Sequence, residues 1–206
     1  METLCADLES MIYELGLERP NLAGFSFGGR VALGFAASRP HLVGDKLSLT
    51  GVSAGRGGLG DLIIEGWRDS LRKGDMNGTA WSFVINGYSR EYLERHSVDW
   101  LKTHVRSVAD SADPGKLLDL ISYSHEDDNL DTTFGVRQSA SRLTQKKIQI
   151  IAAEEDRIAS AQGSARLHEE LRDRNDCMYV EMEGGHLVPF ENPRAWRNLI
   201  LDFMKS

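Results

Sequence analysis

Residues 20–30 read Pro-Asn-Leu-Ala-Gly-Phe-Ser-Phe-Gly-Gly-Arg, and this stretch decides the fold. Pro20 disfavours a helix, and the short apolar run at 21–25 predicts a buried strand. A helical pattern follows from Gly28 and ends before Pro40. A strand that passes through a glycine-flanked turn directly into a helix is typical of parallel sheets with helical crossovers.

The same alternation continues on both sides of this stretch. Apolar residues at helical spacing predict a helix over residues 2–15, and residues 46–52 read as a second strand. From residue 59 to residue 142 the strand signal disappears and several helical patterns follow. The remaining predicted elements are strands at 147–153 and 177–182, a helix between them, and a last helix that begins at Asn192-Pro193.

The predicted fold class is therefore α/β, with a mostly parallel sheet, flanking helices and a helical lid insertion. We expect a first core segment at 1–58, the insertion at 59–142 and a second core segment at 143–206.

Composition excludes several classes of protein. Lys and Arg number 24 against 31 Asp and Glu, a net charge of -7, so the chain lacks the basic excess of a general nucleic-acid binder. Cys5 and Cys177 form neither a disulfide framework nor a zinc motif, and we expect no metal and no cofactor. Four acidic residues within residues 1–15 do not fit a signal peptide, and no apolar run is long enough to span a membrane. We expect a cytoplasmic protein.

Gly24-Phe25-Ser26-Phe27-Gly28 fits the pattern G-x-S-x-G. In a nucleophile elbow the serine occupies a strained turn between a strand and a helix, where nearby side chains would collide. Gly24, Gly28 and Gly29 meet that need, and the helix directs its positive end toward the reacting centre. Ser26 is thus a candidate nucleophile; the alternative is that it only caps the helix.

A serine nucleophile needs a histidine base and an acid that orients this base. His186 lies in Gly184-Gly185-His186, just after the last predicted strand, at the sheet edge where the turn at Ser26 also lies. It is the predicted base, although an incidental loop histidine is the alternative. The other histidines lie in polar helical surroundings, where a solvated ring is the ordinary outcome. They are His41, His96, His104, His125 and His168.

Asp156 is the predicted acid, because it follows strand 147–153 by a few residues at the same edge. Glu154, Glu155 and Asp61 are rivals that the sequence leaves open, and the acidic cluster could also be a solvated loop.

The order Ser26, Asp156, His186 in an alternating chain resembles the α/β-hydrolase superfamily. The strings GFSFGGR, EEDRIAS and GGHLVPFENP resemble its nucleophile, acid and histidine segments, and the similarity covers nearly the whole chain. It implies that Ser26 attacks an ester or lactone carbonyl, that His186 acts as base and then acid, and that Asp156 orients it. It also implies that the backbone N–H of Phe27 is an oxyanion donor.

The resemblance further implies a lid over the substrate pocket. Aromatic residues gather in the insertion, where they could line that pocket or form the insertion's own core; they are Trp67, Trp81, Phe83, Tyr88 and Trp100. We expect Phe25, Trp67 and Trp81 to contact the substrate, a small ester or lactone. The alternatives are a carbon–carbon hydrolase or lyase of the same fold, and a non-catalytic binding scaffold.

The chain departs from the family in one respect. Members usually place the serine after several strands, whereas one predicted helix and one strand precede Ser26. We therefore expect an N-terminally truncated version of the fold, as a fragment, an isoform or a mis-set start, without the loop that supplies the second oxyanion donor. We also expect an unpaired edge at 21–25, impaired activity and self-association through this edge.

Overall fold

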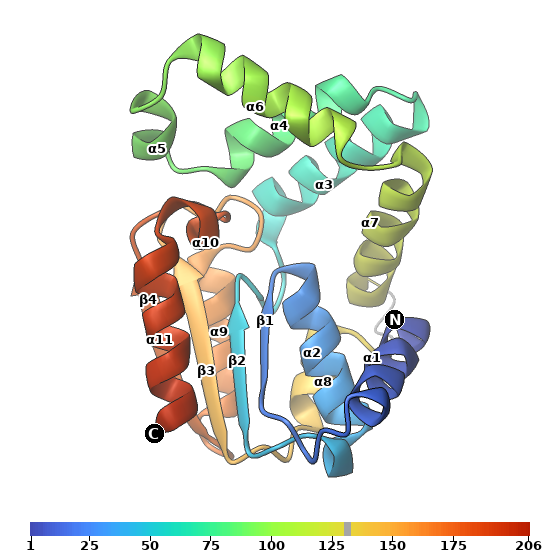
Figure 1. Ribbon diagram of the computed structural model, residues 1–206, viewed down its shortest axis with the longest axis vertical. Coiled ribbons are helices and arrows are strands. Elements are labelled where there is room, and N and C mark those ends of the chain that lie inside the picture. Colours follow the sequence, from blue (N-terminus) through green and yellow to red (C-terminus); the bar gives the residue numbers. More distant parts are fainter. Residues whose placement is uncertain (130–132) are drawn as a thin grey trace.

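A parallel sheet forms the centre of the molecule (Figure 1). The computed structural model describes residues 1–129 and 133–206, with side chains for residues 1–122 and 133–206. Within these residues the sheet has four strands in the order β1-β2-β3-β4, all parallel. The strands are β1 (Leu22–Phe25), β2 (Lys46–Thr50), β3 (Lys147–Ala153) and β4 (Asp176–Met182). The predicted α/β class is confirmed.

Helices cover both faces of the sheet (Figure 1). On one face lie α1 (Glu2–Glu14), α2 (Phe27–Ser38), α8 (Val136–Ser141) and α9 (Ala161–Leu171). On the other lie α10 (Val188–Glu191) and α11 (Pro193–Lys205). A 3-10 turn, η1 (Pro40–Leu42), follows α2.

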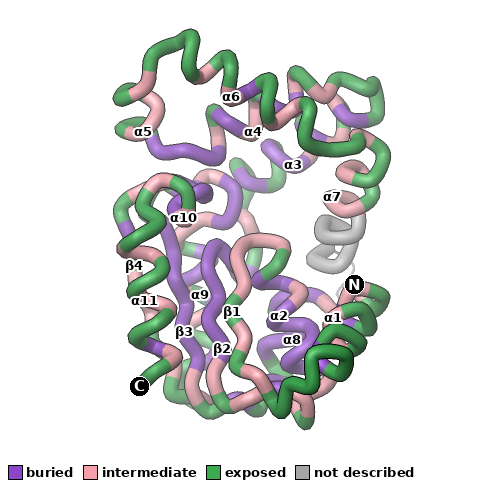
Figure 2. Tube along the Cα trace, viewed as in Figure 1, coloured by how far each residue is buried: buried purple, intermediate pink, exposed green. Residues whose placement is uncertain are grey.

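The core follows from the side-chain alternation of β3. Ile148 and Ile150 pack with the helices of the first face, whereas Ile151 and Ala153 pack against Trp196 and other residues of α11. All four are fully buried or nearly so, and Figure 2 shows β2 and β3 buried along most of their length. A strand covered on both faces is apolar along most of its length, as β3 is apart from Lys147 and Gln149.

A helical layer lies over the carboxyl ends of the strands (Figure 1). It leaves the sheet after β2 and consists of α3 (Gly57–Arg72), α4 (Met76–Gly87), α5 (Arg90–Glu94), α6 (Val98–Asp110) and α7 (Pro114–Asn129). The helix α8, which the sequence placed in the insertion, packs against α2 and α9 beside the sheet. We refer to α3–α7 as the upper helices. None of the helices in the described part of the chain is long and apolar enough to cross a membrane.

The strand β1 lies at one edge of the sheet, since within the described residues it pairs with β2 alone. The sequence predicted such an edge at 21–25. Self-association through it stays a prediction.

Candidate functional site

Ser26 occupies a strained turn between β1 and α2. Its φ of 51° and ψ of -121° lie in a region that residues with side chains rarely adopt. A Cβ on Gly24 would fall 2.6 Å from the carbonyl oxygen of Gly28, and one on Gly29 would fall 2.5 Å from Cγ2 of Val52. Glycine is thus required at 24 and 29. The same expectation for Gly28 is wrong, because a Cβ there would meet nothing within 4 Å.

Ser26, His186 and Asp156 form a chain of hydrogen bonds. Ser26 Oγ lies 2.7 Å from Nε2 of His186, and Nδ1 of the same ring lies 2.7 Å from Oδ2 of Asp156. An ionised carboxylate only accepts hydrogen bonds, so Nδ1–H donates to Asp156. In the neutral ring Nε2 is then the acceptor for the Ser26 hydroxyl. The structure thus brings together the three side chains singled out from the sequence.

The carboxylate of Asp156 is fixed by its own loop. Its Oδ1 accepts hydrogen bonds from the N–H groups of Ile158, at 2.8 Å, and Ala159, at 2.7 Å. The Asp156 side chain is 1% exposed and that of His186 is 4% exposed. Both carboxylate oxygens therefore have defined partners, and water has little access to the pair.

The rival acids lie elsewhere. Glu154 and Glu155 are exposed, and Glu155 accepts a hydrogen bond from the N–H of Arg90. Asp61 is exposed on α3. Asp156 is the acid that the structure hydrogen-bonds to His186.

Two of the histidines expected to be solvated lie instead in a ring stack of the upper helices. The indole of Trp100 stacks on His96, with ring centroids 4.0 Å apart, and on His104, at 5.3 Å. Burial, and to a lesser degree the nearby His96, lower the pKa of His104. His41 is exposed, and His168 donates from Nε2 to a backbone carbonyl oxygen. The side chain of His125 lies outside the described residues.

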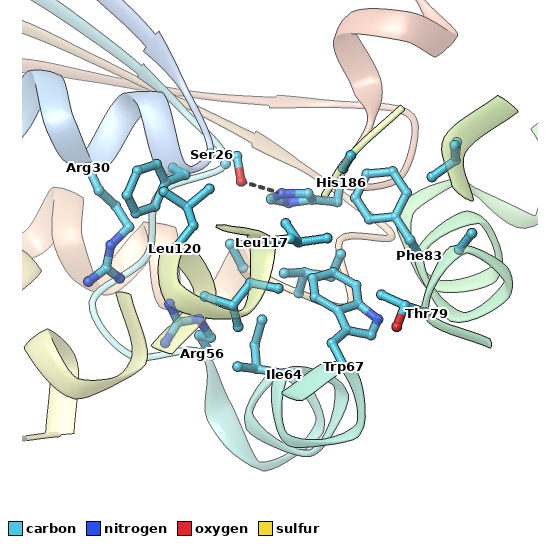
Figure 3. A pocket seen from close by; sticks show the side chains of 18 of the residues that line it. Ser26, Arg30, Arg56, Ile64, Trp67, Thr79, Phe83, Leu117, Leu120 and His186 are labelled. Carbon is cyan, nitrogen blue, oxygen red and sulfur yellow. Dashed lines mark hydrogen bonds between the residues drawn. The ribbon is translucent and has the colours of Figure 1, made fainter. Parts of the chain in front are cut away.

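A cavity of about 380 Å³ opens beside Ser26 and His186 (Figure 3). Its wall is mostly apolar and comes from α3, α4, α7 and the loops after β2 and β3. The described residues that line it include Ile64, Trp67, Ala80, Phe83, Leu117, Leu120, Ile121 and Ile158. The upper helices thus shape the space into which the Ser26 hydroxyl faces.

Of the three predicted substrate contacts, Trp67 lines the cavity. Phe25 does not; its ring packs beside the imidazole of His186, with centroids 5.3 Å apart. Trp81 does not either and is 36% exposed. Thr79 and Ala80 put the inner face of α4 toward the cavity, and Trp81 lies about 200° around the helix from Thr79.

Several lining residues were not found from the sequence. Leu117, Leu120 and Ile121 have the spacing of one helical face, which predicts burial but not the partner of that face. Arg30 and Arg56 also line the cavity, on the side away from Phe83 (Figure 3). Arg30 lies one helical turn after Ser26, in the string GFSFGGR, whereas nothing in the sequence connects Arg56 with Ser26.

The N-terminus of α2 faces the same space. Phe27 is the first residue of α2 and lines the cavity. The N–H groups of a first helical turn have no acceptor within the helix, and they carry the positive end of its dipole. The backbone N–H of Phe27 is therefore suited to bind negative charge that develops next to Ser26 Oγ.

Solved structures of known proteins share the fold of this chain. No protein-family model matches the chain. A deep-sea metagenome α/β hydrolase, MGS-M2, superimposes with a TM-score of 0.82 and 21% identity, over 98% of this chain and 70% of that one. The enol-lactonase from Burkholderia xenovorans LB400 gives a TM-score of 0.79 and 20% identity, over 100% of this chain and 73% of that one. The chain has the α/β-hydrolase fold.

One curated protein is similar to this chain in sequence. Pyrrolizixenacetamide deacetylase from Xenorhabdus hominickii is 25% identical over 186 residues, which cover 90% of this chain. The chain spans 65% of the length of that curated relative. The superpositions on solved α/β hydrolases confirm the fold implied by the strings around Ser26, Asp156 and His186.

Proposed function

We propose that the protein is a serine hydrolase that cleaves a small carboxylic ester or lactone through an acyl-enzyme on Ser26. The observation that supports it most is the chain of two 2.7 Å hydrogen bonds from Ser26 through His186 to Asp156, at the wall of an apolar cavity. Esterases and a lactonase among the proteins of similar fold support the same reaction class.

In the first half of the reaction Ser26 Oγ attacks the carbonyl carbon, while its proton passes to Nε2 of His186. The carbonyl π electrons move to the oxygen, and the backbone N–H of Phe27 donates to this oxyanion. Collapse of the tetrahedral intermediate breaks the bond to the leaving oxygen. That oxygen takes the proton from Nε2 and leaves as an alcohol, or stays attached through the acyl chain if the substrate is a lactone.

In the second half a water molecule gives a proton to Nε2 of His186 and attacks the acyl carbon. The second intermediate collapses, the bond to Ser26 Oγ breaks, and Oγ takes back the proton from Nε2. The products are a carboxylic acid and free enzyme. Asp156 keeps its negative charge throughout and stabilises the imidazolium that forms twice in the cycle.

The cavity indicates the class of acyl group. Side chains such as Trp67, Phe83 and Leu117 offer apolar surface, and burial of apolar area contributes about 25 cal/mol per Å². We propose a largely apolar acyl group held under the upper helices.

An amide substrate is the second candidate, because the curated relative is named as the deacetylase of an acetamide. The same residues would serve, with His186 giving the proton to a leaving amine. Parallel assays with a p-nitrophenyl ester and the matching anilide separate the two candidates.

Labelling with a fluorophosphonate tests the nucleophile. We expect the wild-type chain and Ser38→Ala to be labelled, since Ser38 lies on α2 with its Oγ bonded to the Gly34 carbonyl, away from the cavity. Ser26→Ala should neither label nor hydrolyse the ester. Labelling that persists in Ser26→Ala would remove Ser26 from this role. A wild-type chain that neither labels nor hydrolyses any ester or anilide would contradict the proposed function.

A further inference from the structure

The upper helices are fastened to the loop that carries Asp156. Residues 85–90 cross this loop; they comprise the end of α4, the two connecting residues and the first residue of α5, and we call them the crossing segment. Nη1 of Arg157 donates to the carbonyl oxygen of Ile85 at 2.8 Å. The N–H of Arg90 donates to Oε2 of Glu155 at 3.1 Å. The two neighbours of the acid in the chain therefore both bind the crossing segment.

The crossing segment also binds the loop that carries the histidine. The N–H of Leu187 donates to the carbonyl oxygen of Gly87 at 2.8 Å. Oε1 of Glu191 accepts from the N–H of Gly185, at 2.8 Å, and from the N–H of Ser89, at 2.9 Å. Oε2 of Glu191 accepts from the Ser89 hydroxyl. The backbone N–H groups just before and just after His186 are thus both held, one by Glu191 and one by the crossing segment.

The crossing segment and the loop that carries His186 are in direct backbone contact. A Cβ on Gly185 would fall 2.6 Å from the nitrogen of Ser89 and 2.7 Å from the carbonyl oxygen of Gly87. A Cβ on Gly87 would fall 2.8 Å from Cδ1 of Leu187. Because no side chain separates Gly185 from the backbone of the crossing segment, a shift of one must move the other.

We propose that Glu191 is a positioning residue that holds the His186 ring at hydrogen-bond distance from Ser26 Oγ. This inference rests on the proposed function and adds a residue to it. Glu191 has no hydrogen bond to Ser26, His186 or Asp156, so it acts through the backbone N–H of Gly185. Its carboxylate satisfies three donors, and Ser89, which supplies two of them, is only 4% exposed. Without the carboxylate these donors lose their acceptor in a place that water hardly reaches.

Kinetic comparison of three variants tests the proposal. Glu191→Ala removes all three acceptor contacts, and we expect kcat to fall about 100-fold, with KM changed less than about threefold, because a small misplacement of the base acts on the chemical step. Glu191→Gln keeps one oxygen for the two N–H groups and loses the charge, so its kcat should fall only about fivefold. Glu94→Gln is the control, since Glu94 pairs with Arg90 on the exposed side of α5, and it should keep the wild-type kcat.

Proton NMR gives a readout independent of turnover. The Nδ1–H of His186, bonded to Asp156, should give a low-field resonance in the wild type and in Glu94→Gln. It should broaden, through faster exchange with water, in both Glu191 variants. If the wild type hydrolyses nothing, the proposed function fails, and this resonance still decides the role of Glu191.

Folding is checked for each variant by thermal denaturation. A folded Glu191→Ala with the kcat and the resonance of Glu94→Gln would overturn the proposal. If Glu191→Ala does not fold, the isosteric Glu191→Gln decides, and an unchanged kcat with an unchanged resonance in that variant would overturn it.

Discussion

Replacing Gly51 by alanine should separate a loss of stability from a loss of activity. Gly51 follows β2 with a φ of +63°, in the left-handed region. An alanine there costs about 1–2 kcal/mol of unfolding free energy. In a domain of this size each kcal/mol lowers Tm by about 2–4 °C.

The added methyl group would also meet the proposed base. The new Cβ would lie 3.2 Å from Cε1 of His186 and 3.4 Å from its Nδ1. A contact at 3.2 Å is tighter than most, so the ring must move by a few tenths of an ångström. Because a 1 Å misplacement at an active site costs about 100-fold in rate, we expect kcat of Gly51→Ala to fall about 10-fold.

Gly16→Ala is the matched control. Gly16 has a φ of +61°, and a Cβ there would meet nothing within 4 Å. Both variants should lose similar stability in urea denaturation, and only Gly51→Ala should lose activity toward a p-nitrophenyl ester. Equal activity of the two folded variants would refute the argument that His186 needs the space beside Gly51.

Asp156→Asn should lower kcat on the order of 10,000-fold in a steady-state ester assay, because the amide favours the wrong imidazole tautomer; a fall of less than about 10-fold would contradict the role of the acid. Trp67→Ala should lower the unfolding free energy by about 3–5 kcal/mol and raise KM for an apolar ester. Trp81→Ala, on the face of α4 turned away from the cavity, should leave KM unchanged. Equal KM values for the two variants would count against the cavity as the acyl site. Burial raises the pKa of the Cys5 thiol, and it raises the pKa of the Cys177 thiol to about 12, so both carry less thiolate than an exposed cysteine at the same pH. Ellman's reagent should titrate both thiols in denaturant and neither rapidly in the native chain.

The strands could be predicted well from the sequence, because each lies between strong local signals. The apolar run of 147–153 gives β3 with both ends correct. The predicted strand 46–52 ends two residues early, at Thr50, since Gly51 takes a positive φ that departs from regular strand geometry. Local sequence signals therefore determine whether a segment forms a strand, whereas the φ of the single residue Gly51 determines where β2 ends.

Some residues of the candidate site could be predicted from the sequence and others could not. Ser26, Asp156 and His186 could be singled out because each directly follows a strand or its loop at one edge of a parallel sheet. Glu191 and Trp81 could not be assigned in this way. The first depends on a crossing of two segments about a hundred residues apart in the chain, and the second on which face of α4 turns inward. Contacts of that kind leave no periodic trace in a sequence.

The attachment of the upper helices has a consequence for how substrate preference can diversify. The crossing segment binds the loops mostly through main-chain groups, which belong to Ile85, Gly87, Ser89 and Arg90. One side-chain group, the hydroxyl of Ser89, also takes part. Main-chain groups are present whatever the side chains are. A substitution at a cavity-lining residue of α3, α4 or α7 therefore leaves these hydrogen-bonding groups in place, as long as the glycines at 87 and 185 keep the two backbones in contact.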